Sequence, residues 1–157
     1  MILVTVGSTM FPFARMTVFV ERLARLVPTH ERIIFQYGCV PPETGSARIE
    51  PYAFLEHKQL MAYMKKSSLI ICHGGPATIY QSLSFGKIPW VLPRQERYGE
   101  HLNNHQIDFA DFMASHNLIH HLAPRISPSV MYARDASISP IRKHNAPLIA
   151  YLHTLMR

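Results

Sequence analysis

The segment with the clearest chemical potential is His73–Thr78, which reads His-Gly-Gly-Pro-Ala-Thr. It follows the apolar run Leu69–Cys72 and precedes a helical pattern over residues 79–85, which Gly86 is placed to end. A strand, a glycine turn and a helix N-terminus in this order can present backbone N–H groups and a favourable dipole to an anion. The segment therefore predicts a phosphate site, although a plain turn with Thr78 as the helix N-cap fits the same residues. It is neither a Walker A loop nor a GxGxxG pattern.

Other residues could carry chemistry, and each has an ordinary alternative. His101 and His105 are four residues apart, as two metal ligands on one helical face would be, but no third ligand has suitable spacing. We therefore expect no metal and no cofactor. Cys72 could be a nucleophile, or inert packing inside an apolar strand. Glu96 and Glu100 could supply a general base, or they could be solvated loop charges.

Composition and charge narrow the class of protein. The chain has 157 residues, of which 48% are hydrophobic and 17% charged, and this fits one domain with a buried core. A formal net charge of +6 favours an anionic partner, but the basic residues are scattered and form no run with aromatic residues, which argues against nucleic acid. With two cysteines, no leader pattern and no apolar stretch of about 20 residues, we expect a soluble cytoplasmic protein.

Strand and helix patterns alternate along the chain. Apolar runs predict strands at residues 2–6, 33–37, 69–72, 89–92 and 118–122. Residues 48–54 could form a further short strand, but Pro51 indicates either an edge position or no strand. Helical spacing predicts helices at residues 13–27, 56–67, 79–85, 103–116 and 141–157, with an irregular stretch at 123–139. This alternation predicts an α/β fold, a single Rossmann-like domain with a parallel sheet and helices on both faces. Ligands of such folds bind at the carboxyl ends of the strands.

Three motifs together resemble a known family. Residues 4–9 (VTVGST), 73–78 (HGGPAT) and 91–110, which include VLPR, GEH and NHQIDFA, follow the order found in the C-terminal, donor-binding domain of glycosyltransferase family 28. The resemblance covers residues 1–122. Within the family, the chain resembles the small subunit of split bacterial exopolysaccharide glycosyltransferases and the catalytic subunit of the dolichol-linked UDP-N-acetylglucosamine transferase. The resemblance implies that the chain is one half of a GT-B fold. Residues 123–157 would then be an extension, whose terminal helix either docks a partner or packs on the domain.

The resemblance also implies roles for particular residues. The implied donor-binding positions, from the phosphate loops through the ribose and base contacts to the sugar contacts, are Gly7, Ser8, Thr9, His73, Gly74, Gly75, Thr78, Gln81, Pro93, Glu100, His101, Asn104 and Gln106. Gln81 departs from the glutamate that relatives usually carry for the ribose hydroxyls. His73 and Glu100 are the implied catalytic residues, with the partner as the alternative source of the general base.

The implied activity is transfer of a sugar from a UDP-sugar to a lipid-linked saccharide in exopolysaccharide or capsule synthesis, with inversion at the anomeric carbon and no required metal. If Arg94 or Arg97 reads a carboxylate rather than facing solvent or a partner, UDP-glucuronate would be the donor. A donor half alone implies a membrane-anchored partner subunit that supplies the acceptor side and recruits the chain to the cytoplasmic face of the membrane. The alternatives are a non-catalytic nucleotide-sugar-binding or assembly module, favoured by Gln81, and a nucleotide-sugar epimerase, disfavoured because one domain cannot close a cleft.

Overall fold

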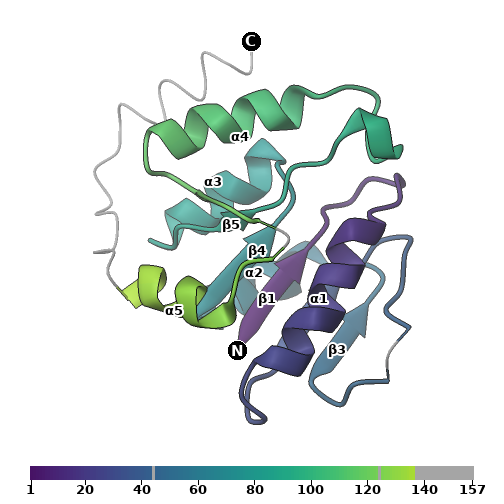
Figure 1. The fold of residues 1–157 in the computed structure, drawn as a ribbon, viewed down its shortest axis with the longest axis vertical. Coiled ribbons are helices and arrows are strands. Elements are labelled where there is room, and N and C mark those ends of the chain that lie inside the picture. Colours follow the sequence, from purple (N-terminus) through teal and green to yellow (C-terminus); the bar gives the residue numbers. More distant parts are fainter. Residues whose placement is uncertain (44, 124, 137–157) are drawn as a thin grey trace.

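Six parallel strands form one sheet in the order β3-β2-β1-β4-β5-β6 (Figure 1). The computed structural model describes residues 1–43, 45–123 and 125–136. The strands are β1 (Ile2–Thr5), β2 (Ile33–Gln36), β3 (Ile49–Tyr52), β4 (Leu69–Cys72), β5 (Trp90–Val91) and β6 (His120–His121). The helices are α1 (Ala14–Leu26), α2 (His57–Lys66), α3 (Pro76–Ser84), α4 (His105–Ser115) and α5 (Pro128–Ala136), with a 3-10 helix η1 (Glu96–Tyr98). The predicted α/β, Rossmann-like fold is confirmed.

Alternate residues of the strands point to opposite faces of the sheet, and each face has its own helices. On one face, Val4 and Ile71 pack with α1 and α5. On the other, Leu3 and Ile70 pack with α2, while Cys72 packs with α3 and α4. Figure 1 shows α1 and α5 in front of the sheet and α2 behind it. Both faces are therefore covered, which explains why the central strands β1, β2 and β4 are largely apolar.

The carboxyl ends of the central strands lie in register. Thr5 of β1 pairs with Gln36 of β2 on one side and with Cys72 of β4 on the other, and Cys72 pairs with Val91 of β5. The three segments that follow β1, β4 and β5 therefore begin at the same level of the sheet. They begin where the strand order reverses between β1 and β4, the usual place for a ligand in this kind of fold.

Helix α5 corrects a prediction, because residues 123–139 were expected to be irregular. Pro128 occupies the first position of α5. A proline is tolerated there, since the first N–H groups of a helix have no helical partner. Met131 of α5 is fully buried and packs into the same cluster as α1. The helix predicted at residues 141–157 lies outside the described residues.

Strand β3 lies at the edge of the sheet, as Pro51 predicted. The carbonyls of Arg48 and Tyr52 accept hydrogen bonds from Ile33 N and Tyr37 N, at 2.8 and 2.9 Å. The backbone N–H and C=O groups of the even-numbered residues in this strand therefore point toward β2. Pro51 then faces outward, where its missing N–H breaks no bond of the sheet.

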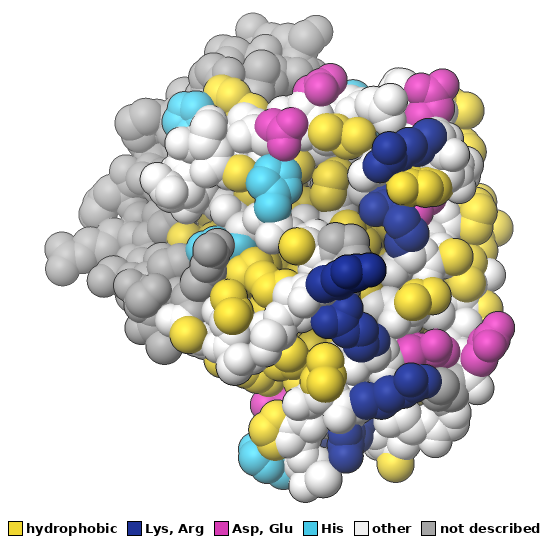
Figure 2. Space-filling view, in the orientation of Figure 1, with side chains coloured by type: hydrophobic (Ala, Val, Ile, Leu, Met, Phe, Trp, Pro, Cys, Tyr) yellow, Lys and Arg dark blue, Asp and Glu magenta, His cyan; other side chains and the backbone are white. Residues whose placement is uncertain are grey.

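Basic side chains that are scattered in the sequence gather on one face of the folded chain. Arg15, Arg22 and Arg25 are seven and three residues apart on α1, so they project from one side of the helix. Figure 2 shows Lys and Arg side chains in a band over the region of α1. Within the described part of the chain, no helix combines the length and the apolar character needed to cross a membrane.

Candidate functional site

The first loop leaves β1 at Gly7, which is held by two buried polar side chains. Gly7 has φ +77°, in the left-handed region that favours glycine. Its N–H donates to Thr5 Oγ1 at 3.2 Å, and its carbonyl accepts from Gln36 Nε2 at 2.6 Å. Sequence reasoning missed Thr5 and Gln36 as supports of this loop. The available signal was a single polar residue at the carboxyl end of each of two apolar strands.

The imidazole of His73 lies between two glycines from different parts of the chain. A Cβ placed on Gly7 would lie 2.5 Å from His73 Cε1, and a Cβ on Gly75 would lie 2.2 Å from His73 Nε2. Real Cβ atoms do not approach ring atoms this closely, so neither position admits a side chain while His73 stays in place. The ring thus joins the first loop to the glycine turn.

Burial determines the protonation state of His73. Its side chain is 8% exposed, and burial lowers its pKa to about 3, with the positive charge of Arg94 and then His101 acting in the same direction. The imidazole is therefore neutral at physiological pH. Within the described residues, its Nδ1 is buried without a hydrogen-bond partner. A neutral ring with a pKa this low is a weak base, but it can still form a hydrogen bond with a ligand.

The glycine turn leads into α3 in the orientation that anion binding requires. Gly75 is the N-cap and Pro76 follows at the first helical position. Ile79 N donates to Gly75 O at 3.2 Å, and the N–H groups before Ile79 in the first turn point out of the helix end. Thr78 is buried in that turn and does not cap it, so the alternative of a threonine N-cap is wrong. Gln81 is half-buried one turn further along the same side of the helix.

Helix α4 and the segment after β5 close on the other side of the turn. A Cβ on Gly74 would lie 2.9 Å from Gln106 Cβ and 3.2 Å from Pro93 Cβ. Gln106 is buried, and its Oε1 accepts a hydrogen bond from Arg94 N at 3.2 Å. The structure therefore brings Gly74, Pro93 and Gln106 together, as the resemblance implied.

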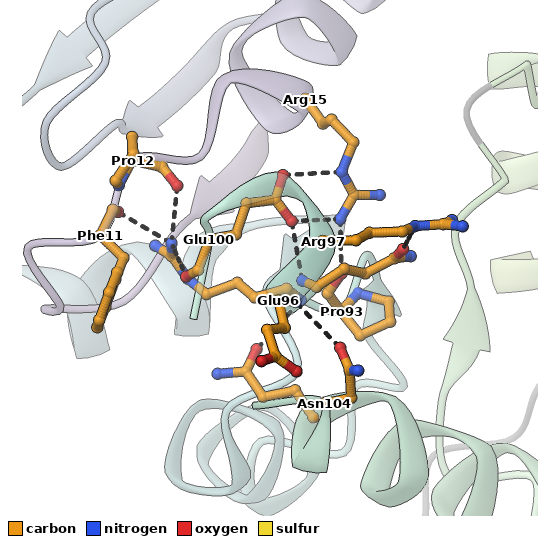
Figure 3. A network of polar contacts seen from close by, with 11 residues as sticks. Phe11, Pro12, Arg15, Pro93, Glu96, Arg97, Glu100 and Asn104 are labelled. Atoms are coloured by element: carbon orange, nitrogen blue, oxygen red, sulfur yellow. Dashed lines mark hydrogen bonds and ion pairs between the residues drawn. The ribbon is translucent and has the colours of Figure 1, made fainter. Parts of the chain in front are cut away.

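Arg94 lies neither at the surface nor in a position to bind a ligand carboxylate, the two alternatives that the sequence left open. Its side chain is fully buried, so it neither faces solvent nor reads a carboxylate on a ligand. Nη2 donates to Val6 O at 2.8 Å, and Nη1 donates to Phe11 O at 2.9 Å, with longer bonds to Pro12 O and Glu100 O. The carbonyls of Phe11 and Pro12 lie on the side of this network opposite Arg15 (Figure 3).

Glu100 forms a buried ion pair with Arg15 of α1. Glu100 is 2% exposed, and its two oxygens accept from Nε and Nη2 of Arg15 at 2.8 and 2.5 Å. Arg15 also donates to Pro93 O at 2.9 Å (Figure 3). The second oxygen of Glu100 accepts a further bond from Gln95 N. Both carboxylate oxygens are therefore engaged in charge-assisted or backbone hydrogen bonds, and the arrangement suits a support of the loop better than a general base.

The sequence profile of the glycosyltransferase family 28 C-terminal domain matches residues 1–122. The chain belongs to this family. Comparison with curated proteins found no match. Among solved structures, the chain is similar to the crystal structure of the glycosyltransferase of kitacinnamycin, with a TM-score of 0.64 and 18% sequence identity over 87% of this chain. That likeness confirms the fold. The chain spans only 34% of the length of that protein.

The remaining predicted positions of this family 28 domain lie at the outer rim. Ser8 is exposed, and Thr9 is half-buried with its Oγ1 accepting from Phe11 N at 3.4 Å. Asn104 is exposed and accepts a hydrogen bond from Glu96 N at 3.0 Å. Gln106, two residues further along, is buried.

His101 and His105 do not share a helical face, because His101 precedes α4. The ring of His101 stacks on Phe11 with centroids 5.6 Å apart, and His105 meets it edge-on at 4.6 Å. Burial, followed by the neighbouring His105 and Arg94, lowers the pKa of His101. Among the described residues, no three His, Cys, Asp or Glu side chains are grouped as metal ligands.

Cys72 is a packing residue. Its side chain is fully buried against α3 and α4, and burial raises the pKa of its thiol well above the usual range. A protonated, inaccessible thiol is not a nucleophile, so of the two alternatives for Cys72 inert packing is confirmed.

Proposed function

We propose that this family 28 domain binds the UDP part of a UDP-sugar and is the donor-binding half of a glycosyltransferase. The observation that carries the proposal is the closed turn at the N-terminus of α3, with His73 held between Gly7 and Gly75. Backbone N–H groups, a helix N-terminus and a neutral imidazole meet there, and all three suit a diphosphate. Thr78 belongs to the same turn beside the diphosphate, and Gln81 extends that side of α3 toward the ribose.

The proposed reaction is transfer of a sugar to a hydroxyl of a lipid-linked saccharide. The acceptor oxygen attacks the anomeric carbon, the bond to the β-phosphate oxygen breaks with inversion, and UDP leaves with the bonding electrons. The N-terminus of α3 stabilises the charge that develops on UDP, and His73 contributes a hydrogen bond. Because Glu100 is engaged by Arg15, we assign the general base that takes the hydroxyl proton to the acceptor side.

The donor sugar would lie near Gln106, beyond the diphosphate. Oε1 of Gln106 already accepts a bond from Arg94 N, which directs its amide N–H₂ group toward a sugar hydroxyl as the donor. Since Arg94 is buried, the argument for UDP-glucuronate now depends on exposed Arg97 alone. We therefore propose a UDP-hexose or UDP-hexuronate donor, with UDP-glucuronate as one member to be compared with UDP-glucose.

The proposal includes a partner subunit that supplies the acceptor side in exopolysaccharide or capsule synthesis. The chain spans 34% of the length of the similar glycosyltransferase, and in this proposal the partner provides the acceptor-binding part. The arginines along α1 and the net charge of +6 support a place beside an anionic membrane, at its cytoplasmic face, with the partner as the anchor.

Calorimetric titration of the chain with UDP tests donor binding, and transfer from a panel of UDP-sugars in the presence of the co-expressed partner tests catalysis. We expect UDP to bind and transfer to require the partner. Absence of UDP binding both with and without the partner would refute the proposal. Binding without transfer would favour the second candidate, a non-catalytic nucleotide-sugar-binding module, for which glutamine rather than glutamate at position 81 is the supporting observation.

A further inference from the structure

The guanidinium of Arg94 is buried without a carboxylate acceptor of its own. In the described structure, each of its hydrogen bonds ends on a backbone carbonyl oxygen, at Val6, Phe11, Pro12 and Glu100. The guanidinium also lies over the ring of Phe13, 4.6 Å from the ring centroid. Burial of a charge is costly unless hydrogen bonds compensate it; here neutral carbonyls accept from Nη1 and Nη2, while Nε is buried without a hydrogen-bond partner among the described residues.

These carbonyls belong to the two segments that flank the glycine turn. Val6, Phe11 and Pro12 bracket the first loop, and Glu100 belongs to the segment between β5 and α4. The bond to Val6 O holds the peptide that leads into Gly7, the residue that packs on His73. Arg94 therefore fixes the first loop in place relative to the turn.

The positive charge at this point is not cancelled locally. The nearby carboxylate is Glu100, and both of its oxygens accept hydrogen bonds from Arg15. The buried guanidinium of Arg94 and the half-buried guanidinium of Arg15 are thus accompanied by a single negative charge. A net positive charge thus lies behind the residues that would contact the diphosphate. In a partly buried site, such a charge acts over several ångströms with little screening.

We propose that Arg94 is a positioning residue for the donor diphosphate, because it fixes the first loop beside the His73 turn and holds an uncancelled positive charge behind the phosphates. This inference rests on the proposed function, since it requires UDP to bind at the turn. It assigns Arg94 to the leaving group and not to the sugar.

The test compares three variants of the full chain by NMR titration with UDP and with uridine, which lacks the phosphates. Arg94→Met removes the charge and the loop contacts, and Arg94→Lys keeps a charge but cannot reach all four carbonyls. Arg32→Met is the control, because Arg32 is an exposed arginine that precedes β2, at the end of the sheet opposite the glycine turn, and pairs with Glu50. Hydrogen exchange at the amides of residues 8–11 follows the first loop in each variant.

We expect Arg94→Met to weaken UDP binding about 10-fold or more while uridine binding changes less than about 2-fold. Arg94→Lys should lose less UDP affinity than Arg94→Met, both variants should exchange faster at residues 8–11, and Arg32→Met should match the wild type. If Arg94→Met does not fold, Arg94→Lys provides the test instead: its loss of UDP affinity should be larger than its loss of uridine affinity.

Two results would overturn the inference while leaving the proposed function intact. One is an equal loss of UDP and uridine affinity, which would make Arg94 a purely structural residue. The other is unchanged UDP affinity or unchanged loop exchange in the Arg94 variants. Failure of the wild-type chain to bind UDP is a different outcome, because it would remove the proposed function and this inference with it.

Discussion

His73 occupies the space that a side chain at Gly7 would fill, with Cε1 only 2.5 Å from the position of a Cβ on that glycine. The two residues come from segments that follow different strands, β1 and β4. Their contact means that the first loop and the glycine turn are shaped together and cannot be altered independently. The stability of the fold and the geometry of the candidate site should therefore respond to the same substitutions.

Gly7→Ala should destabilise the chain by about 2–4 kcal/mol, because it adds left-handed backbone strain at φ +77° and displaces His73. Urea unfolding followed by circular dichroism measures the change. Gly45→Ala is the matched control, since a Cβ there meets nothing within 4 Å, and it should shift the free energy of unfolding by less than about 0.5 kcal/mol. Equal effects of the two substitutions would contradict the described packing.

Gly75→Ala should be destabilising only while His73 is present. Gly75 has φ −75°, which alanine adopts readily, so the cost arises from the 2.2 Å approach to His73 Nε2. In a double-mutant cycle, His73→Ala should remove nearly all of the penalty of Gly75→Ala. It should leave about 1 kcal/mol of the Gly7→Ala penalty, which is the backbone strain. An additive cycle for Gly75 and His73 would refute this.

His73 should make the chain less stable in mild acid. Its pKa is about 3 in the folded chain and about 6.5 when unfolded, so between these values the unfolded chain binds a proton that the folded chain does not. The free energy of unfolding should then fall as the pH falls below about 6.5, by up to about 1.4 kcal/mol per unit. His73→Gln should show a shallower pH dependence in parallel unfolding experiments. Carboxylates titrate in both proteins, so identical slopes would show that His73 is not the group responsible.

Glu100→Gln should act mainly on stability, because Glu100 is paired with Arg15 in a largely buried setting. We expect a loss of about 1–3 kcal/mol, with a similar loss for Arg15→Met. Loss of a general base would instead lower the rate of sugar transfer about 10²–10⁴-fold. Glu96→Gln, an exposed carboxylate in the same segment, is the control and should leave stability unchanged. A rate loss of that size in a fully folded Glu100→Gln chain would return Glu100 to the catalytic group.

Thr78→Val should weaken UDP binding by about 1–3 kcal/mol, the cost of leaving a phosphate contact unmade. The substitution preserves shape in the first turn of α3, where Thr78 is buried. Ser84→Ala, at the exposed end of the same helix, should bind UDP as the wild type does. Titration calorimetry on both variants makes the comparison, and unchanged affinity for Thr78→Val would remove Thr78 from the site.

The order of strands and helices could be predicted because it depends on local patterns. The short apolar runs correspond to β1, β2 and β4, and the helical spacing of apolar residues from Phe13 to Val27 corresponds to α1. The glycine turn was also evident, since its residue types are restrictive. The position of α5 was missed because Pro128 was interpreted as a break, although proline is equally suited to begin a helix.

The support of the candidate site could not be predicted in the same way. Arg94 and Glu100 lie in a polar, charged segment that resembles an exposed loop. Their burial depends on contacts 83 residues away at Phe11 and 85 residues away at Arg15. No local pattern encodes such partners. The family motifs lie in the same region, but they do not distinguish the proposed ligand contacts from the residues that hold the loops.

Pro51 has a consequence for how this chain can associate with others. On the outward side of β3, Ile49 N already donates to Ser46 O at 3.0 Å, and Pro51 has no N–H to offer. A strand from another molecule would find no donor at either position and could not extend the sheet in register. We therefore expect that a second polypeptide does not associate with this chain by adding a strand at β3.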